Sequence, residues 1–212
     1  MPNYRRAYQP GGTYFFTVVT HRRQTLFQWE EARRILHEAI QRVQTERPFE
    51  MPAIVLLPDH LHCIWKLPEA DADFSRRWGC IKKYFTQAWL KERCAMHTLH
   101  YEEKRCAVHT LPGAHGFEEN VSPTRRKHRE RGVWQKRFWE HRIRDEDDYM
   151  RHVNYIHYNP VKHRLVNCPH EWAYSSFARW MEEGYYNEHW LCSCKAKVEM
   201  PNFDDIQHSV GE

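Results

Sequence analysis

The sequence has no run of about 20 apolar residues, which is the length that a membrane-spanning helix needs. Its first ten residues, MPNYRRAYQP, also lack the apolar core of a signal peptide. These two absences exclude a spanning helix and a recognisable secretion signal. We therefore expect a cytoplasmic protein with no membrane partner.

The seven cysteines include no C-x-x-C pair, and their spacing along the chain is irregular. Such a pattern indicates neither a disulfide framework nor a zinc ribbon. We expect reduced thiols. Cys192 and Cys194 are close enough in sequence to touch one metal, but exposed thiols on a C-terminal tail are the simpler interpretation.

With 212 residues, of which 41% are hydrophobic, the chain is long enough to form one domain with a substantial core. The formal net charge of +4 permits a nucleic-acid partner without demanding one. The local pattern is more informative, because arginine binds phosphate oxygens in pairs. Basic clusters recur at Arg5-Arg6, Arg22-Arg23, Arg33-Arg34, Arg76-Arg77, Lys82-Lys83 and 125–131 (RRKHRER).

The stretch Met51–Leu67 combines two apolar runs that predict one or two buried strands, interrupted near Pro58-Asp59. Side chains alternate between the faces of a strand, so His60 and His62 project from the same face. Two adjacent imidazoles are suitable ligands for a divalent metal. The alternative is that both are ordinary sheet histidines bonded to backbone carbonyls.

The remaining pattern predicts a mixed α/β domain at 1–183, followed by a tail at 184–212. Residues 94–131 have no clear period and predict an insertion or a long loop. The helix that starts after Asp145 should stop at Asn159-Pro160. The other expected elements are a strand at 13–20, helices at 29–47 and 73–93, an extended segment at 133–143 and a short helix at 172–177.

Tyr155 and Asn159 are one helical turn apart, so they share a helix face. Together with His60 and His62 they form a coherent set, in which the histidines and the amide oxygen hold Mg²⁺ or Mn²⁺ and the phenol attacks a phosphate in DNA. Tyr158 is a competing nucleophile about 60° away around the helix, and Tyr149 is a weaker third candidate.

Several motifs resemble the HUH-type single-tyrosine transposases, and within them the REP-associated tyrosine transposases. The resemblance covers roughly residues 3–93 and 133–180, and does not include 94–131 or the tail. The matching motifs are Tyr4-Arg5-Arg6, Gly11-Gly12-Thr13, 57–65 (LPDHLHCIW), 137–141 (RFWEH) and 155–163 (YIHYNPVKH).

This resemblance implies a ferredoxin-like α+β fold, in which a central antiparallel sheet is flanked by helices. It implies that His60 and His62 bind the metal and that Tyr155 is the nucleophile. Asn159 stands where related transposases carry glutamine. The implied substrate is single-stranded DNA with a repetitive extragenic palindromic (REP) hairpin, cut and rejoined through a covalent 5′-phosphotyrosine.

We expect a bacterial protein, monomeric or homodimeric, that is associated with the nucleoid when it binds single-stranded or hairpin DNA. Basic side chains would contact phosphates or bases. The candidates for these contacts are Arg5, Arg6, Lys82, Lys83, Lys136, Arg137 and Lys162.

Three alternatives to this strand-transferase stay open. The first is a domesticated protein that binds hairpins with little or no cleavage. The second is a rolling-circle initiator or relaxase, which usually carries further modules. The third is a metallohydrolase with an H-x-H site, whose barrel would need about 250 residues.

Overall fold

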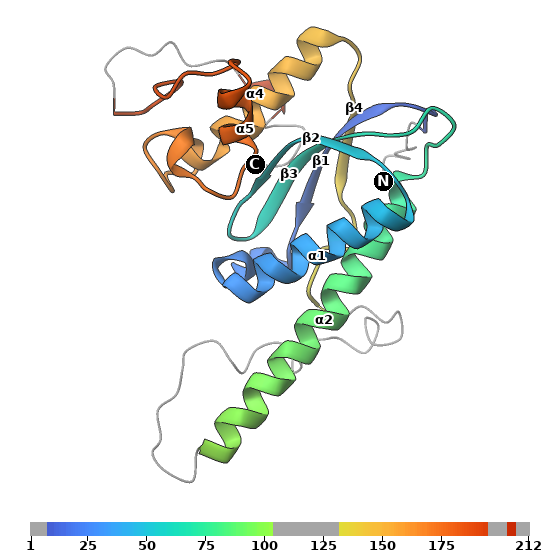
Figure 1. The fold of residues 1–212 in the computed structure, drawn as a ribbon, viewed down its shortest axis with the longest axis vertical. Coiled ribbons are helices and arrows are strands. Elements are labelled where there is room, and N and C mark those ends of the chain that lie inside the picture. The colour runs from blue at the N-terminus through green and yellow to red at the C-terminus, as the bar shows by residue number, and fades with distance from the viewer. Residues whose placement is uncertain (1–7, 104–131, 195–202, 207–212) are drawn as a thin grey trace.

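A four-stranded antiparallel sheet forms the centre of the computed structural model (Figure 1). The structure describes residues 8–103, 132–194 and 203–206, and describes only the backbone of 94–103. The strands lie in the order β2-β3-β1-β4. Their bounds are β1 Thr13–Val19, β2 Glu50–Leu56, β3 His60–Lys66 and β4 Trp139–Arg142.

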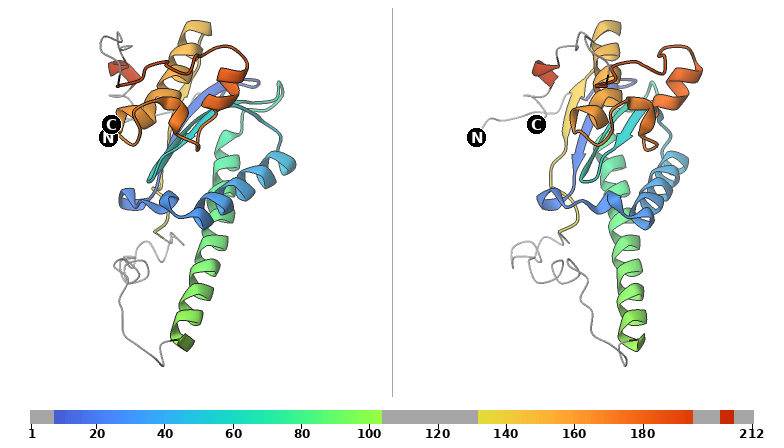
Figure 2. Two further views of the ribbon diagram at one scale, coloured as in Figure 1. Left: turned by 60° about the vertical axis from the view of Figure 1, so that its left-hand side comes forward. Right: turned by 90° about the vertical axis from the view of Figure 1, so that its left-hand side faces the viewer.

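Helices cover both faces of this sheet (Figures 1 and 2). The helices α1, Glu30–Glu46, and α2, Phe74–Glu103, pack against each other on one face. The helix α4, Glu146–Lys162, covers the other face together with α5, Phe177–Glu182. The order β1-α1-β2-β3-α2-β4, with β1 and β3 in the middle of the sheet, is ferredoxin-like, so the predicted fold class is confirmed.

Strand β3 divides its side chains between two hydrophobic clusters. Leu61, Cys63 and Trp65 pack into the cluster beneath α1 and α2. Ile64, on the opposite face, belongs to the cluster that contains residues of α4. Because both faces are covered, every residue of β3 except its last is buried, which explains its nearly continuous apolar sequence. His60 and His62 share the Ile64 face, as the alternation predicts.

The turn between β2 and β3 is held by the end of β1. The backbone N–H of Thr20 donates to the carbonyl oxygen of Asp59 at 2.9 Å, and the Thr20 hydroxyl donates to the same oxygen at 2.8 Å. A 3-10 helix, η1 at His21–Arg23, follows directly, and a second, η2 at Leu26–Gln28, leads into α1. The position of Asp59 next to the histidine pair is therefore fixed by hydrogen bonds.

Two helices extend beyond their predicted ends. Helix α2 continues to Glu103, so residues 94–103 are helical where the sequence predicts a loop, and residues 104–131 lie outside the described part of the chain. Helix α4 passes through Pro160 and ends at Lys162. Proline lacks the N–H that would donate to the Ile156 carbonyl, yet the helix continues for two more residues, and the Leu165 N–H donates to the Pro160 carbonyl at 2.9 Å.

The prediction of a short helix at 172–177 is wrong, because helix α5 begins only at Phe177. The preceding residues run extended beside β2. Ser175 forms an isolated bridge with Val55, and the Ser176 N–H donates to the Ile54 carbonyl at 2.9 Å. The start of α4 agrees with prediction, since the Asp145 side chain accepts a hydrogen bond from the Asp148 N–H.

The cysteines also depart from expectation. Cys168 and Cys192 are paired as a disulfide, whereas the sequence predicts reduced thiols, and Cys192 is buried although it was expected to be exposed. The fold brings together two segments 24 residues apart, a separation that no short motif records. Cys194 is a free, exposed thiol, as expected.

Within the described residues, no helix combines the length and the apolar character needed to cross a membrane.

Candidate active site

The histidine pair lies at the start of β3, on the face covered by α4. His60 and His62 are 1% and 0% exposed, and their ring centroids are 4.9 Å apart. His60 Nδ1 lies 2.5 Å from Asp59 Oδ1, and His62 Nδ1 lies 2.9 Å from the hydroxyl oxygen of Thr17. A carboxylate accepts, so Nδ1 of His60 carries the proton and Nε2 would be its metal-binding atom.

Asp59 is held as a carboxylate by its surroundings. Burial alone would raise its pKa, but hydrogen bonds and charge from His60 and Arg23 bring the pKa below its ordinary value. The Arg23 guanidinium is 3.1 Å from Asp59 Oδ2. An ionised carboxylate behind an imidazole orients that ring and raises its basicity, as in many histidine metal sites.

Tyr155 faces the histidine pair from α4. Its side chain is fully buried, and its ring centroid lies 5.3 Å from that of His62. The Lys162 ammonium donates to the Tyr155 hydroxyl at 3.1 Å and lies 5.0 Å from the centre of its ring. The phenol oxygen is therefore next to a cation. The Phe203 ring covers Tyr155 with a centroid separation of 5.6 Å.

The two competing tyrosines have other neighbours. Tyr158 stacks on Phe203 at 5.9 Å, and burial raises its pKa. Tyr149 lies 6.4 Å from Trp180, and burial raises its pKa too. Tyr155 combines the contact with His62 and the hydrogen bond from a lysine.

Asn159 lies one turn after Tyr155 and is completely buried. Its Nδ2 donates to the Tyr155 carbonyl oxygen at 2.7 Å. Among the described residues, its Oδ1 has no hydrogen-bond partner. A buried amide oxygen without a partner carries a desolvation cost and requires an explanation, and a cation would supply one.

Three residues near the site were missed by sequence reasoning: Thr17, Asp59 as a functional group, and His163. Thr17 pairs directly with His62 in the β1–β3 register, which only the sheet reveals. Asp59 precedes the H-x-H motif, and that adjacency was a usable signal. The His163 ring lies 5.3 Å from that of His60, where the end of α4 approaches β3.

The predicted DNA-contacting residues are spread over several places. Lys82 of α2 donates to the Gln135 carbonyl at 3.0 Å and so ties α2 to the segment before β4. Lys83, Lys136 and Arg137 are exposed. Lys162 is at the tyrosine rather than on an open surface. Arg5 and Arg6 lie outside the described residues.

A surface hollow of about 550 Å³ lies far from the histidine pair. Thr13 and Lys66 line it, and the sheet register pairs them at the end of β1 and β3 opposite to Val19 and His60. Its other charged residues are of both signs, including Arg142, Arg144, Glu50 and Glu146. The cluster of His60, His62 and Tyr155 is instead buried beneath α4 and Phe203.

Fold and site together define an α/β domain in which a histidine pair on the second central strand faces a tyrosine of the covering helix. No family model matches the sequence. The chain is 40% identical over 191 residues to the REP-associated tyrosine transposase of Escherichia coli, covering 90% of this chain and 91% of that protein.

A provisionally named REP-associated tyrosine transposase of Haemophilus influenzae is 38% identical over 190 residues, covering 90% of this chain and 93% of the relative. A solved structure of a REP-associated tyrosine transposase bound to a REP hairpin is 38% identical, with a TM-score of 0.66, and the match covers 96% of this chain and 99% of that one. The chain belongs to the REP-associated tyrosine transposases.

Proposed function

We propose that the protein is a metal-dependent single-stranded DNA endonuclease and strand-transferase, acting on REP hairpins through a covalent 5′-phosphotyrosine at Tyr155. The main support is one arrangement: the Tyr155 hydroxyl accepts a hydrogen bond from Lys162 while its ring contacts His62. A candidate nucleophile, a cation and a pair of metal ligands thus share one buried site.

The side chains suit a small divalent cation. His60, His62 and Asn159 would hold Mg²⁺ or Mn²⁺, with Asp59 and Thr17 orienting the two imidazoles. The Asn159 oxygen, which has no hydrogen-bond partner among the described residues, supports this assignment because hard cations prefer oxygen ligands. The ion would act as a Lewis acid on a phosphate oxygen.

The chain's own groups supply the nucleophile and its activation. A phenol has a pKa near 10 in water, and an ammonium group in contact with it favours the anion. The Tyr155 oxygen would form a bond to phosphorus as the bond to the 3′-oxygen breaks, and that oxygen leaves with the electron pair and takes up a proton. Reversal with another 3′-hydroxyl would rejoin the strand and release the tyrosine.

The hairpin itself is proposed from the family. The solved relative is bound to a REP hairpin, and exposed Lys83, Lys136 and Arg137 provide this chain with cations for a phosphate backbone. Non-catalytic hairpin binding is the alternative function, because the same surface would serve either role.

The experiment that tests the proposal mixes the full chain with labelled single-stranded REP hairpin DNA and Mg²⁺ or Mn²⁺. We expect an SDS-resistant adduct that disappears in Tyr155→Phe and persists in Tyr158→Phe. Peptide mapping should place the DNA on Tyr155. An adduct on Tyr158 would overturn the choice of nucleophile. Tight hairpin binding without any adduct from the unaltered protein would favour the binding function.

A further inference from the structure

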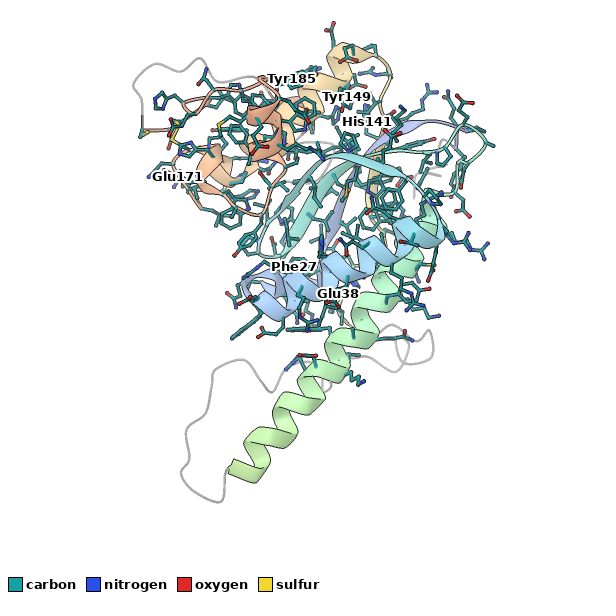
Figure 3. The ribbon with its side chains drawn as sticks, viewed as in Figure 1. Phe27, Glu38, His141, Tyr149, Glu171 and Tyr185 are labelled. Carbon is teal, nitrogen blue, oxygen red and sulfur yellow. A yellow bond between two sulfur atoms is a disulfide. The ribbon has the colours of Figure 1, made fainter. Side chains whose placement is uncertain are left out.

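A second group of metal-ligating side chains lies outside the proposed active site. The 3-10 helix η3, Pro169–Glu171, follows Cys168 and carries His170, and Cys192 and Cys194 come from the segment after α5. Figure 3 labels Glu171, the last residue of η3, in the part of the molecule built by α4 and α5. The two short segments have the pattern C-x-H and C-x-C.

The ligand atoms of this group converge. Those of Cys168, His170 and Cys192 all lie within 4.8 Å of one another. The Sγ atoms of Cys168 and Cys194 are 3.7 Å apart. Bonds of about 2.3 Å at tetrahedral angles place two thiolates on a zinc ion about 3.8 Å apart, so this separation is what a shared zinc requires.

Backbone hydrogen bonds bring the two segments together. The Ser193 N–H, between Cys192 and Cys194, donates to the carbonyl oxygen of Asn167 at 2.8 Å. Within the first segment, the N–H groups of Asn167 and Cys168 donate to Glu171 Oε2 at 2.9 and 3.1 Å and so fix the turn that carries Cys168. The sulfur atoms are therefore held close together by the loop itself.

The imidazole is oriented as a metal ligand would be. His170 Nδ1 lies 2.7 Å from the Glu188 carbonyl oxygen, which can only accept, so Nδ1 carries the proton and the lone pair lies on Nε2. Metal-bound histidines almost always donate their second ring N–H to a carboxylate, a carbonyl or water. His189, in the same loop, is exposed and is not among the three residues whose ligand atoms lie within 4.8 Å of one another, whereas Cys194 is linked to them by its 3.7 Å distance to Cys168 Sγ.

We propose that the reduced chain binds one Zn²⁺ ion through Cys168, His170, Cys192 and Cys194. Three thiolates and one imidazole are a soft donor set typical of structural zinc, and four protein ligands leave no open position for catalysis. The three thiols would release their protons on binding, which makes the affinity depend on pH.

The disulfide and the zinc site exclude each other, because both use the sulfur atoms of Cys168 and Cys192. A disulfide alone does not explain why the Cys194 thiol lies 3.7 Å from the Cys168 sulfur, or why an oriented imidazole lies within 4.8 Å of both disulfide sulfurs. A zinc ion accounts for all four. It would join the loop after α4 to the segment after α5, and so stabilise the layer in which Trp172 donates to the Leu56 carbonyl of β2 at 3.0 Å.

The test begins with full-length protein purified under reducing conditions without chelator. Elemental analysis should find about one zinc per chain. Replacing zinc with Co²⁺ should produce thiolate-to-metal charge-transfer absorption, which the histidine pair of the proposed active site cannot give because it contains no sulfur. Removing the metal with a chelator should lower the melting temperature, and adding Zn²⁺ should restore it.

Two exposed ligands allow variants that should still fold. Cys194→Ser and His170→Gln are each expected to lose bound zinc at least about tenfold faster to a competing chelator. Their matched controls, Cys80→Ser and His189→Gln, should retain it. Absence of zinc after reconstitution of the reduced chain, zinc retention unaffected by both variants, or a Cys168–Cys192 disulfide that persists as the sole form would each overturn the proposal.

Discussion

At the scale of single residues, Asp59 is a neighbour of the proposed metal ligands that would control how they bind a metal. Its carboxylate accepts from His60 Nδ1 at 2.5 Å and is itself held by Arg23 at 3.1 Å. The Asp59 charge raises the basicity of the imidazole and fixes its tautomer. Its influence on the proposed metal site should therefore be large although it is not one of the proposed ligands.

We expect Asp59→Asn to weaken Mn²⁺ binding roughly 10- to 100-fold, because the amide keeps the shape of the side chain and loses the charge. Isothermal titration calorimetry measures this directly. Asp147→Asn, an exposed acid on the first turn of α4, is the control and should leave Mn²⁺ affinity unchanged. Equal affinities for Asp59→Asn and the unaltered chain would contradict the role given to this carboxylate.

The sequence and the structure indicate different roles for Lys162. The sequence predicts a DNA contact, whereas the structure places its ammonium 3.1 Å from the Tyr155 hydroxyl. Lys162→Met should slow adduct formation at least about tenfold and move its pH dependence to higher pH, because the phenol loses a cation that favours its anion. Single-turnover assays across pH measure both effects.

The control for that variant is Lys83→Met, an exposed lysine. Neutralising a phosphate contact should reduce the salt dependence of hairpin binding by about one unit of slope and leave the adduct rate per bound complex unchanged. If Lys162→Met reduced the salt slope and left that rate intact, Lys162 would be a DNA contact, as the sequence predicts.

At the scale of elements, the parts best predicted from sequence were those with strong periodicity. The strand at 13–20, the strands flanking Pro58-Asp59 and the helix of α1 were expected within a few residues, because alternating or 3.6-residue patterns record one buried face directly. The pairing of Thr17 with His62 could not be read this way, since register is a property of two strands.

The errors have identifiable causes. The helix at 94–103 was missed because its sequence has no clear helical period, so no buried face could be recognised there. Residues 172–176 were expected to be helical, yet the Trp172 indole and the Ser176 backbone donate hydrogen bonds to β2. Cys192 and Cys194 were considered as ligands of one metal, but the approach of Cys168 and His170 was missed because they come from another segment that only the fold brings near.

Access to Tyr155 is also a property of elements. The tyrosine is fully buried, and Phe203 lies 5.6 Å from it, in a short segment tied to α4 by the Arg151–Asp205 ion pair at 2.6 Å. In the proposed reaction, Tyr155 would have to become accessible to a DNA phosphate, and Phe203 is one of the groups that cover it.

Phe203→Ala should therefore increase the rate of adduct formation several-fold, because a smaller fraction of molecules would hide the phenol. Arg151→Ala, which releases the same segment without touching Tyr155, should act in the same direction and more weakly. Quenched-flow measurement of the covalent complex tests both. A Phe203→Ala rate equal to or below that of the unaltered chain would mean that this ring does not limit access.

At the scale of the whole molecule, helix α4 carries buried histidines whose charge states bear on stability. Burial lowers the pKa of His157 to about 3 and that of His152 to about 4. His157 is satisfied as a neutral ring by Ser176 at 2.8 Å and Tyr186 at 3.2 Å. Asp148 differs: burial would raise its pKa, but hydrogen bonds from His141 and Arg144 lower it to about 2.

These pKa values determine how stability depends on pH. An unfolded histidine titrates near pH 6.5, so between that pH and about 3 the unfolded chain binds a proton that the folded His157 does not, and stability falls as pH falls through this window. The Asp148 contribution is present above its unfolded pKa near 3.9 and is lost as pH falls from there towards 2. Mild acid should therefore act on the histidines first.

We expect the melting temperature of the metal-free chain to fall steadily between pH 7 and pH 4, with His157 accounting for on the order of 3 kcal/mol of lost stability. His157→Gln should be less stable than the unaltered chain at pH 7, because its bonds to Ser176 and Tyr186 are disturbed, and should lose less stability on acidification. His189→Gln, at an exposed site, should keep the full pH dependence. Metal-free protein is used because protonation of thiolates at the proposed zinc site would otherwise add to the pH dependence. If the melting temperature of His157→Gln fell as steeply with pH as that of the unaltered chain, other buried groups would be responsible for the acid sensitivity of the fold.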